Sequence, residues 1–309
     1  MSTLGIDTSN YTTSVAVYRA DGTGMNDGRL LTVPEGGRGL RQSDALFQHV
    51  KRLPDRFAAL AQAGFLEGIQ AVGASSRPRR VEGSYMPCFL AGLSQGKSLA
   101  QTLGVPFYAC SHQEGHIAAA CWSAGRMELL DEPLLAWHLS GGTTELLLVT
   151  PDGCSVQAKC IGGASDLSAG QLIDRTGQRL GLSFPAGKAL DALAQEATHR
   201  ERYRVKLKDL QFSLSGMENQ VAKLVEQGKD PADVAWFTLA TIGSAVRRVT
   251  DEAKRQYPGL PVLCSGGVAS NRLLRQILSD AVFAAPEFST DNAMGVAILT
   301  QRQLGREQP

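Results

Sequence analysis

The chain has 309 residues, of which 31 are Lys or Arg and 30 are Asp or Glu, giving a formal net charge of +1. This balance provides no overall charge to attract nucleic acid or a membrane surface, so an anionic partner must be met by a local basic patch. The six cysteines include no C-x-x-C pair, which is typical of reduced, mostly buried thiols in a cytosolic protein. No segment approaches the roughly 18 uninterrupted apolar residues of a transmembrane helix. We therefore expect a soluble, cytoplasmic protein, and its length suggests two lobes.

Strand-like apolar runs alternate with helical patterns along the chain, which indicates an α/β fold. Residues 4–18 and residues 134–149 share one plan: a short apolar strand, a turn of small polar residues and a returning strand. The second follows an acidic and polar connection at residues 128–133. The recurrence predicts two similar lobes around a central cleft, an N-terminal lobe of residues 1–125 and a C-terminal lobe of residues 126–309. We expect the last helix to belong to the second lobe and to pack near the cleft.

The stretch SHQEGHIAAA, residues 111–120, predicts a helix with His112 and His116 on one face, where both could bind one metal ion. A zinc protease helix reads H-E-x-x-H, because the glutamate directly after the first ligand acts as the base. Here Gln113 follows His112, and Glu114 lies about 200° around the helix from it, away from the metal side. The sequence therefore lacks the glutamate base that a zinc protease would need on this helix. If no third ligand exists, the alternative to metal binding is that one member of the pair is a polar surface histidine and the other a buried core histidine.

Three further segments have a possible use in binding a nucleotide. The turn SGG at residues 140–142 offers backbone N–H groups that could cradle phosphate oxygens, although most such turns only satisfy backbone geometry. A second SGG, at residues 265–267, joins a buried strand to a helix whose N-terminus favours an anion. Asn271 in that helix could point toward the ligand or be a capping residue. Asp174 lies beside an apolar helical stripe, where it could bind ribose hydroxyls or simply face solvent.

Six motifs occur in an order and at a spacing that resemble those of the TsaD family, once called the glycoprotease or Gcp family. They are HQEGH, LSGGTTELL, AGQLIDRTGQRLGLSFPAGKAL, LQFSLSGME, SGGVASNRLLR and FSTDNAMGVAI. The resemblance covers nearly the whole chain. It implies an actin-like ATPase (ASKHA) fold, and a transferase that moves threonylcarbamoyl from threonylcarbamoyl-AMP to N6 of adenosine 37 in tRNA. It also implies TsaB-like and TsaE-like partner proteins.

The resemblance further assigns residues to the site. One divalent metal, iron or zinc, would be held by His112, His116 and Asp291, although Asp291 could instead cap the final helix. His138 is a fourth candidate ligand, because imidazole suits iron and zinc. An ATP-type or AMP-type nucleotide, or threonylcarbamoyl-AMP, would be held by His138, Leu139, Ser140, Gly141, Gly142, Asp174, Gly187, Gly266, Gly267 and Asn271. The metal would act as a Lewis acid, and no catalytic proton-transfer residue is identified.

The sequence departs from the family pattern at several places: residues 142–144 read GTT where the family has G-H-T, Ala186 replaces one of two consecutive glycines, and two further segments differ more strongly. The first hairpin in the family usually reads E-T-S-C-D-E-T, whereas residues 7–13 here read DTSNYTT, without the pair of acids in the turn. A basic loop, which contains Arg77, Arg79, Arg80 and Tyr85, stands where the family has a glycine-rich one. Such a loop could alter the acceptor or merely face water.

Two functions therefore remain open, besides the disfavoured metallopeptidase. The first is the metal-dependent transferase itself. The second is a paralogue that binds nucleotide and metal but acts on another acceptor or serves as a partner protein. For a tRNA acceptor the sequence offers alternating basic residues, which could line one side of an extended segment: Arg200, Arg202, Arg204, Lys206 and Lys208.

Overall fold

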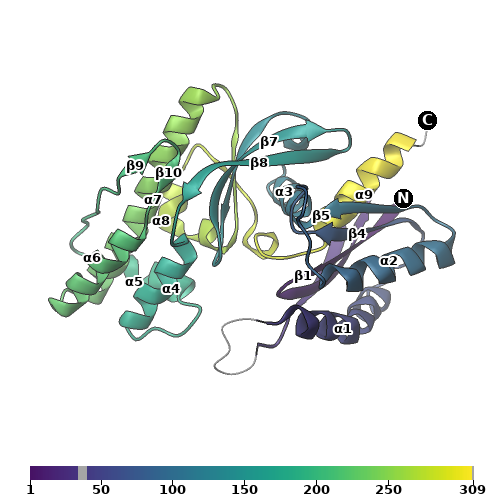
Figure 1. Cartoon of the computed structure of the whole chain (residues 1–309), viewed down its shortest axis with the longest axis horizontal. Helices are drawn as coiled ribbons and strands as arrows, with labels where there is room; N and C mark the ends of the chain where they lie inside the picture. Colours follow the sequence, from purple (N-terminus) through teal and green to yellow (C-terminus); the bar gives the residue numbers. More distant parts are fainter. Residues whose placement is uncertain (34–39, 308–309) are drawn as a thin grey trace. The chain divides into compact units, whose positions relative to one another are not determined.

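The computed structural model describes residues 1–33 and 40–307, and its contacts divide the chain into two compact units. The first unit comprises Met1–Glu132, Thr150–Ala158 and Asp291–Pro309, and the second comprises Pro133–Val149 and Lys159–Thr290. Each unit contains one sheet flanked by helices, as expected for an α/β fold (Figure 1).

The first unit is built on a five-stranded sheet in the order β3-β2-β1-β4-β5. The predicted first hairpin is present: β1 (Ser2–Ser9) pairs antiparallel with β2 (Thr12–Arg19), which in turn pairs with β3 (Gly24–Leu30). On its other side β1 runs parallel to β4 (Ile69–Arg77), and β4 runs parallel to β5 (Phe107–Ser111).

Alternation along β1 decides which helices cover each face of this sheet. Leu4 and Ile6 point into a core formed with α1 (Gln42–Gln62) and α2 (Phe89–Leu103). Gly5 faces α9 (Met294–Glu307) instead, where a Cβ atom would come within 2.5 Å of the Ala297 amide nitrogen. Figure 1 shows α1 and α2 on one face of the sheet and α9 on the other.

Two glycines bring α9 against α3 (His112–Ser123). A Cβ atom on Gly295 would lie only 1.7 Å from the carbonyl oxygen of Gly115. Helix α3 is followed by the short 3-10 helix η1 (Met127–Leu130). Because the backbones touch, the first turns of α3 lie beside the segment that enters α9.

The second unit carries a seven-stranded sheet in the order β12-β11-β6-β7-β8-β10-β9. Its strands are β6 (Leu134–Leu139), β7 (Thr144–Asp152), β8 (Ser155–Ala164), β9 (Leu207–Lys208), β10 (Gln211–Phe212), β11 (Val262–Ser265) and β12 (Val282–Phe283). The series β8-β7-β6-β11-β12 repeats the series β3-β2-β1-β4-β5, so the similarity predicted from the two hairpins is present in the sheets.

Helices of the second unit enclose a core around Trp137, whose indole N–H donates to the Thr250 hydroxyl over 2.8 Å. They are α4 (Ala169–Arg179), α5 (Gly187–Ala194), α6 (Ser215–Glu226), α7 (Pro231–Gln256) and α8 (Arg272–Ile277), with short 3-10 helices η2 (Gly267–Ser270) and η3 (Pro286–Phe288).

The division into units differs from the predicted boundary after residue 125. Helix α9 packs on β1 and β4 of the first unit, and the tip of the β7–β8 hairpin belongs there too. The reason is the small residues that let α9 approach, since Gly73, like Gly5, leaves room for it.

Two expectations drawn from composition can be compared with the structure. All six cysteines are free thiols, but only Cys88, Cys121 and Cys264 are buried, and Cys160 is exposed. Burial raises the pKa of Cys121 and of Cys264 to about 12. Among the described residues, no helix has the length and apolar character needed to cross a membrane.

The close contact of α3 and α9 predicts that Gly295→Ala lowers the free energy of unfolding by about 3 kcal/mol, because the new methyl group collides with backbone. Gly305→Ala is the matched control on the same helix. No atom lies within 4 Å of its added methyl, and alanine there should stabilise by about 0.5 to 1 kcal/mol. Urea unfolding with an unchanged slope would measure both effects, and similar losses for the two variants would contradict the expectation.

Candidate metal centre

A capping box fixes where helix α3 begins and therefore where its histidines lie. The Ser111 hydroxyl accepts from the Glu114 amide over 3.3 Å, and the Glu114 carboxylate accepts from the Ser111 amide over 2.6 Å. His112 is thus the first helical residue, and His116 lies one turn further along the same face.

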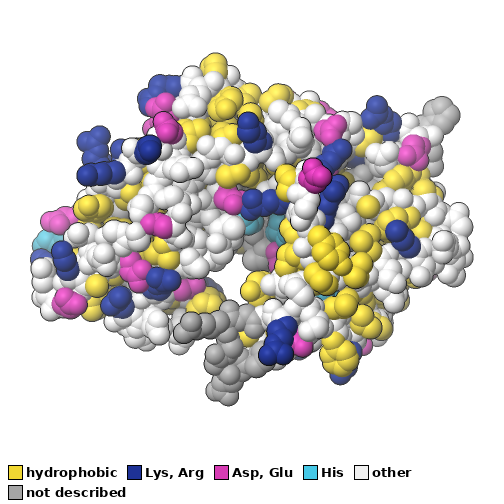
Figure 2. All heavy atoms as spheres, viewed as in Figure 1, with side chains coloured by type: hydrophobic (Ala, Val, Ile, Leu, Met, Phe, Trp, Pro, Cys, Tyr) yellow, Lys and Arg dark blue, Asp and Glu magenta, His cyan; other side chains and the backbone are white. Residues whose placement is uncertain are grey.

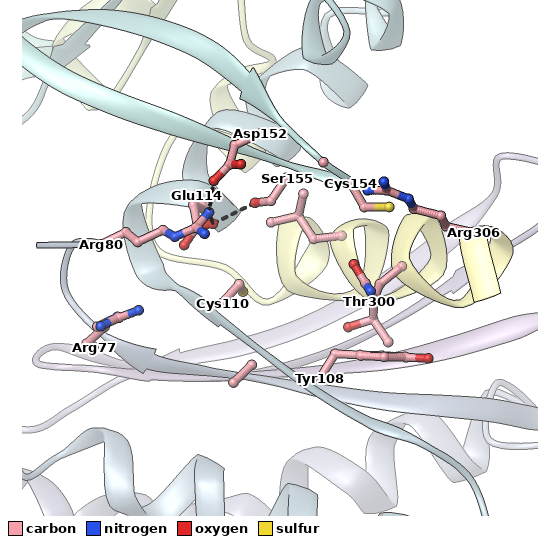
Figure 3. Close-up of a pocket in the computed structure, with 14 residues that line it drawn as sticks. Arg77, Arg80, Tyr108, Cys110, Glu114, Asp152, Cys154, Ser155, Thr300 and Arg306 are labelled. Carbon is pink, nitrogen blue, oxygen red and sulfur yellow. Dashed lines mark hydrogen bonds and ion pairs between the residues drawn. The ribbon is translucent and has the colours of Figure 1, made fainter.

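Glu114 is committed to contacts on the side of α3 away from the histidines. Its buried carboxylate also accepts from the Ser155 hydroxyl over 2.6 Å and lies 3.7 Å from the Arg80 guanidinium. Arg80 in turn pairs with Asp152 at 2.5 Å (Figure 3). The predicted direction of Glu114 is therefore confirmed, and this carboxylate is not placed to act as a protease base.

His112, His116 and Asp291 form a triangle of potential metal ligands. The two Nε2 atoms are 2.9 Å apart, and Asp291 Oδ1 lies 3.2 Å from His116 Nε2 and 3.4 Å from His112 Nε2. Donors bonded to one ion at about 2.1 Å are separated by about 3.0 Å in octahedral geometry and about 3.4 Å in tetrahedral geometry. The three atoms therefore fit one transition-metal ion.

Charge at the triangle favours a cation. Asp7 is fully buried, and its Oδ1 lies 2.9 Å from His112 Nδ1. Although burial opposes protonation, the carboxylates of Asp7 and Asp291 raise the pKa of His112 to about 10. Burial likewise acts to raise the pKa of Asp291, but His112 and His116 hold that pKa well below its usual range. The cluster therefore attracts positive charge, whether a proton or a metal ion carries it.

Asp291 does not cap helix α9, the alternative role that its place in the sequence allowed. The Asn292 side chain accepts from the Met294 amide over 3.1 Å, and the Asn26 side chain accepts from the Ala293 amide over 2.9 Å. Asp291 Oδ2 instead accepts from the Thr12 hydroxyl over 3.3 Å. Asparagines thus satisfy the backbone at the start of α9, and Asp291 is left to face the histidines.

The basic loop after β4 is tied to the start of α3. The Pro78 carbonyl accepts from the Gln113 amide over 3.0 Å, and the Ser84 hydroxyl accepts from the Arg79 amide over 3.1 Å. Tyr85 is 62% exposed. Beside the loop is a cavity of about 320 Å³, which Figure 3 shows between Arg77 and Arg80 on one side and Arg306 on the other. Part of the basic cluster is therefore structural, through Arg80.

In the second unit, the two glycine turns meet at the carboxyl ends of β6 and β11. His138 of β6 is paired with Ser265 of β11. Gly266 has φ 94°, and a Cβ atom there would lie 2.2 Å from the Leu139 carbonyl oxygen. Only glycine permits this conformation together with such a close approach.

The N-terminus of α4 lies against the first of these turns. The Ser168 hydroxyl donates to the Gly141 carbonyl over 2.7 Å, and a Cβ atom on Gly170 would lie 2.5 Å from Gly141 Cα. Within the turn, the Ser140 hydroxyl accepts from the Thr143 amide over 3.1 Å. Gly142 and Gly267 would meet no other atom within 4 Å if a Cβ were added. The glycine turns therefore leave open space next to a helix N-terminus.

The predicted polar residues of this region have partners within the unit. Asn271 caps α8 by accepting from the Leu274 amide over 3.0 Å, and it donates to Asp191 over 2.7 Å. Asp174 accepts from the Ala186 amide over 2.8 Å, just before Gly187 begins α5. The capping role is thus the one that the structure displays for Asn271.

Sequence reasoning did not predict the contacts that Asp7, Thr12 and Asp191 make. The one signal for Asp7 was an acidic side chain within an otherwise apolar and hydroxylated strand. Thr12 and Asp191 reach their partners across 279 and 80 residues of sequence, and no local pattern predicts such contacts.

The chain has the actin-like ATPase (ASKHA) fold. It resembles full-length HypF in its phosphate- and nucleotide-bound form, with a TM-score of 0.62 and 14% identity over 99% of this chain and 47% of that one. It also resembles component A of (R)-2-hydroxyglutaryl-CoA dehydratase from Acidaminococcus fermentans, with a TM-score of 0.57 and 17% identity over 99% of each chain.

The family follows from the sequence comparison. Residues 39–298 match the profile of TsaD, the tRNA N6-adenosine threonylcarbamoyltransferase. The enzyme of that name from Thermus thermophilus is 33% identical over 322 aligned positions, which cover all of this chain and 95% of the relative. The chain belongs to the TsaD family, and it is accordingly an enzyme of the transferase class.

Proposed function

We propose that this protein transfers threonylcarbamoyl from threonylcarbamoyl-AMP to N6 of adenosine 37 in tRNA, with the help of one divalent metal ion, iron or zinc. The observation that carries the proposal is the ligand triangle of His112, His116 and Asp291, in a member of a transferase family whose relatives bear this activity in their names. The tRNA acceptor makes the cytoplasm the expected location.

The residues of the first unit would position the reacting group. A metal ion held by His112, His116 and Asp291 would supply Lewis-acid polarisation of the acyl or phosphate oxygens of the donor. Glu114 would keep α3 in register through its capping box.

Residues of the second unit would hold the nucleotide. The turn of residues 140–142 lies at the N-terminus of α4, where backbone N–H groups favour a phosphate. Gly266 and Gly267 form the adjoining turn, braced by Asn271 and Asp191. Asp174 and Gly187 mark the start of α5 beside it. HypF, which shares this fold, has been solved with phosphate and nucleotide bound.

A transfer assay tests the main proposal. The protein is incubated with threonylcarbamoyl-AMP, unmodified tRNA and TsaB-like and TsaE-like proteins, and the modified nucleoside is measured by mass spectrometry. We expect product from the wild-type protein and a loss of at least about a hundredfold in His116→Ala, which removes a metal ligand. His199→Ala, an exposed histidine of the second unit, is the control and should keep full activity.

The alternative function is favoured by the absence of the acidic pair from the turn of the first hairpin, where Tyr11 and Thr12 stand, and by the basic loop of residues 77–85. If the wild-type protein binds metal but forms no modified tRNA nucleoside with partners supplied, the protein acts on another acceptor or serves as a nucleotide-binding partner.

His138 remains a proposed ligand. It lies half-buried in β6, opposite Glu145 of β7 and Ser265 of β11. We expect His138→Ala to lower the bound metal measured by plasma mass spectrometry and to weaken metal affinity by at least about tenfold. The His199→Ala protein again provides the control. Unchanged metal content and affinity in His138→Ala would exclude it from the ligand set.

A basic segment before β9 is the proposed contact with tRNA. Val205 is buried and accepts from the Arg248 guanidinium, while Arg202, Arg204 and Lys206 are exposed around it. Arg200 stacks over the Trp236 ring at 4.5 Å. Figure 2 shows Lys and Arg side chains gathered over β9 and the segment that precedes it. Alternate side chains of an extended segment lie about 6.6 Å apart, a spacing suited to successive phosphates.

Electrostatic anchoring predicts that tRNA affinity falls steeply with salt concentration. Replacing Arg202 and Arg204 together by alanine should weaken binding and reduce the slope of log affinity against log salt by about 2. Arg255→Ala, which removes an exposed arginine already paired with Glu252, should leave the slope unchanged. Fluorescence titration at several salt concentrations measures all three proteins. A flat salt response of the wild-type protein would exclude this contact.

The outer face of α1 is the proposed docking surface for a TsaB-like partner. Phe47 and Val50 are 63% and 54% exposed, and Pro54, Ala58 and Ala61 continue their stripe along the helix. Exposed apolar residues at intervals of three and four are typical of a helix that packs against another protein. A TsaE-like protein would complete the assembly.

A further inference from the structure

We propose that Asp7 and Thr12 are positioning residues of the metal site: Asp7 presents the Nε2 atom of His112 to the ion, and Thr12 fixes the carboxylate of Asp291. The inference rests on the metal site of the proposed function and adds residues of this chain that do not themselves touch the metal.

Side chains along the first hairpin alternate between the two faces of the sheet, and this alternation puts Asp7 and Thr12 on the same face. In the register of β1 and β2, Asp7 is opposite Ser14 and Thr12 is opposite Ser9, so these four side chains share a face. Gly5 lies on that face too and contacts α9. The intervening Thr13 points to the other face, where it bonds His49 of α1 over 2.8 Å. One short hairpin thus reaches the two elements that carry the ligands.

Asp7 decides which nitrogen of His112 is available. Its ionised carboxylate can only accept a hydrogen bond, so Nδ1, 2.9 Å away, carries a proton, and Nε2 is the nitrogen left to bind an ion in place of a proton. That Nε2 atom is the one that lies in the ligand triangle. A carboxylate behind a ligating histidine commonly fixes the ring in this way and raises its basicity. The other oxygen of Asp7 accepts from the Ser9 amide over 3.4 Å.

Thr12 decides which oxygen of Asp291 is available. Its hydroxyl donates to Oδ2 over 3.3 Å, while Oδ1 faces the two histidines. The carboxylate can therefore offer one oxygen to an ion, with its rotation restrained. Without the hydroxyl, the side chain could turn or present both oxygens, since a carboxylate accepts as readily through either.

The test uses Co²⁺, whose visible spectrum reports coordination geometry. Affinity is measured by competition with a chelator for the wild-type protein, Asp7→Asn, Thr12→Val and the matched control Thr13→Val. In Asp7→Asn the amide oxygen remains opposite the Ser9 N–H, so the NH₂ group faces Nδ1 and drives the proton to Nε2. We expect a 10- to 100-fold loss of affinity and an altered spectrum. Thr12→Val should lose about tenfold and also shift the spectrum.

Thr13→Val makes the same change at the next residue, on the opposite face. It should leave cobalt affinity and spectrum within about twofold of wild type, although it breaks a buried hydrogen bond and lowers the unfolding temperature. Equal affinity losses in Thr12→Val and Thr13→Val would overturn the proposal, because the effect would then be one of general stability. Should Asp7→Asn fail to fold, Thr12→Val and its control still decide the role of Thr12.

The outcomes also separate this inference from the function on which it rests. A wild-type protein that binds no cobalt refutes the metal site itself. If Asp7→Asn and Thr12→Val bind cobalt as tightly as the wild-type protein and give the same spectrum, only the positioning roles are refuted.

Discussion

The contact between helices α3 and α9 at Gly115 and Gly295 is the constraint on which the candidate metal centre depends. Helix α3 supplies two of the candidate ligands, and the third precedes α9. The three donor atoms lie within 3.4 Å of one another only because the two backbones approach without side chains between them. Gly5 and Gly73 in the sheet let α9 settle close enough to reach this position. Small residues in four separate elements thus determine the ligand geometry.

Local patterns in the sequence predict a large share of this arrangement. The spacing of His112 and His116 predicts a shared helix face, and the helical angle places Glu114 on the other side. The two hairpins predict a repeated sheet, which the strand order confirms. These features depend on residues a few positions apart, where periodicity is informative.

Contacts between distant segments could not be derived in this way. The bond from Asp7 to His112 joins residues 105 positions apart, and the bond from Ser155 to Glu114 spans 41. The predicted boundary after residue 125 differs from the observed division for the same reason: no local sequence pattern shows that α9 packs on β1. For Asn271 the sequence allowed two roles, a helix cap or a ligand-binding side chain. The structure displays the cap, together with a hydrogen bond to Asp191.

The return of α9 to the first sheet has a consequence for how the protein is made. The first unit needs residues 1–132, the hairpin tip at 150–158 and the segment from Asp291 onward, so its folding cannot be completed while the last of these is still inside the ribosome. Until then, the faces of β1 and β4 that α9 covers stay open and the histidines of α3 lack their carboxylate. The second unit, whose residues end at Thr290, is fully synthesised first. A metal ion held by the triangle of His112, His116 and Asp291 would therefore be bound late, after the segment from Asp291 onward has left the ribosome.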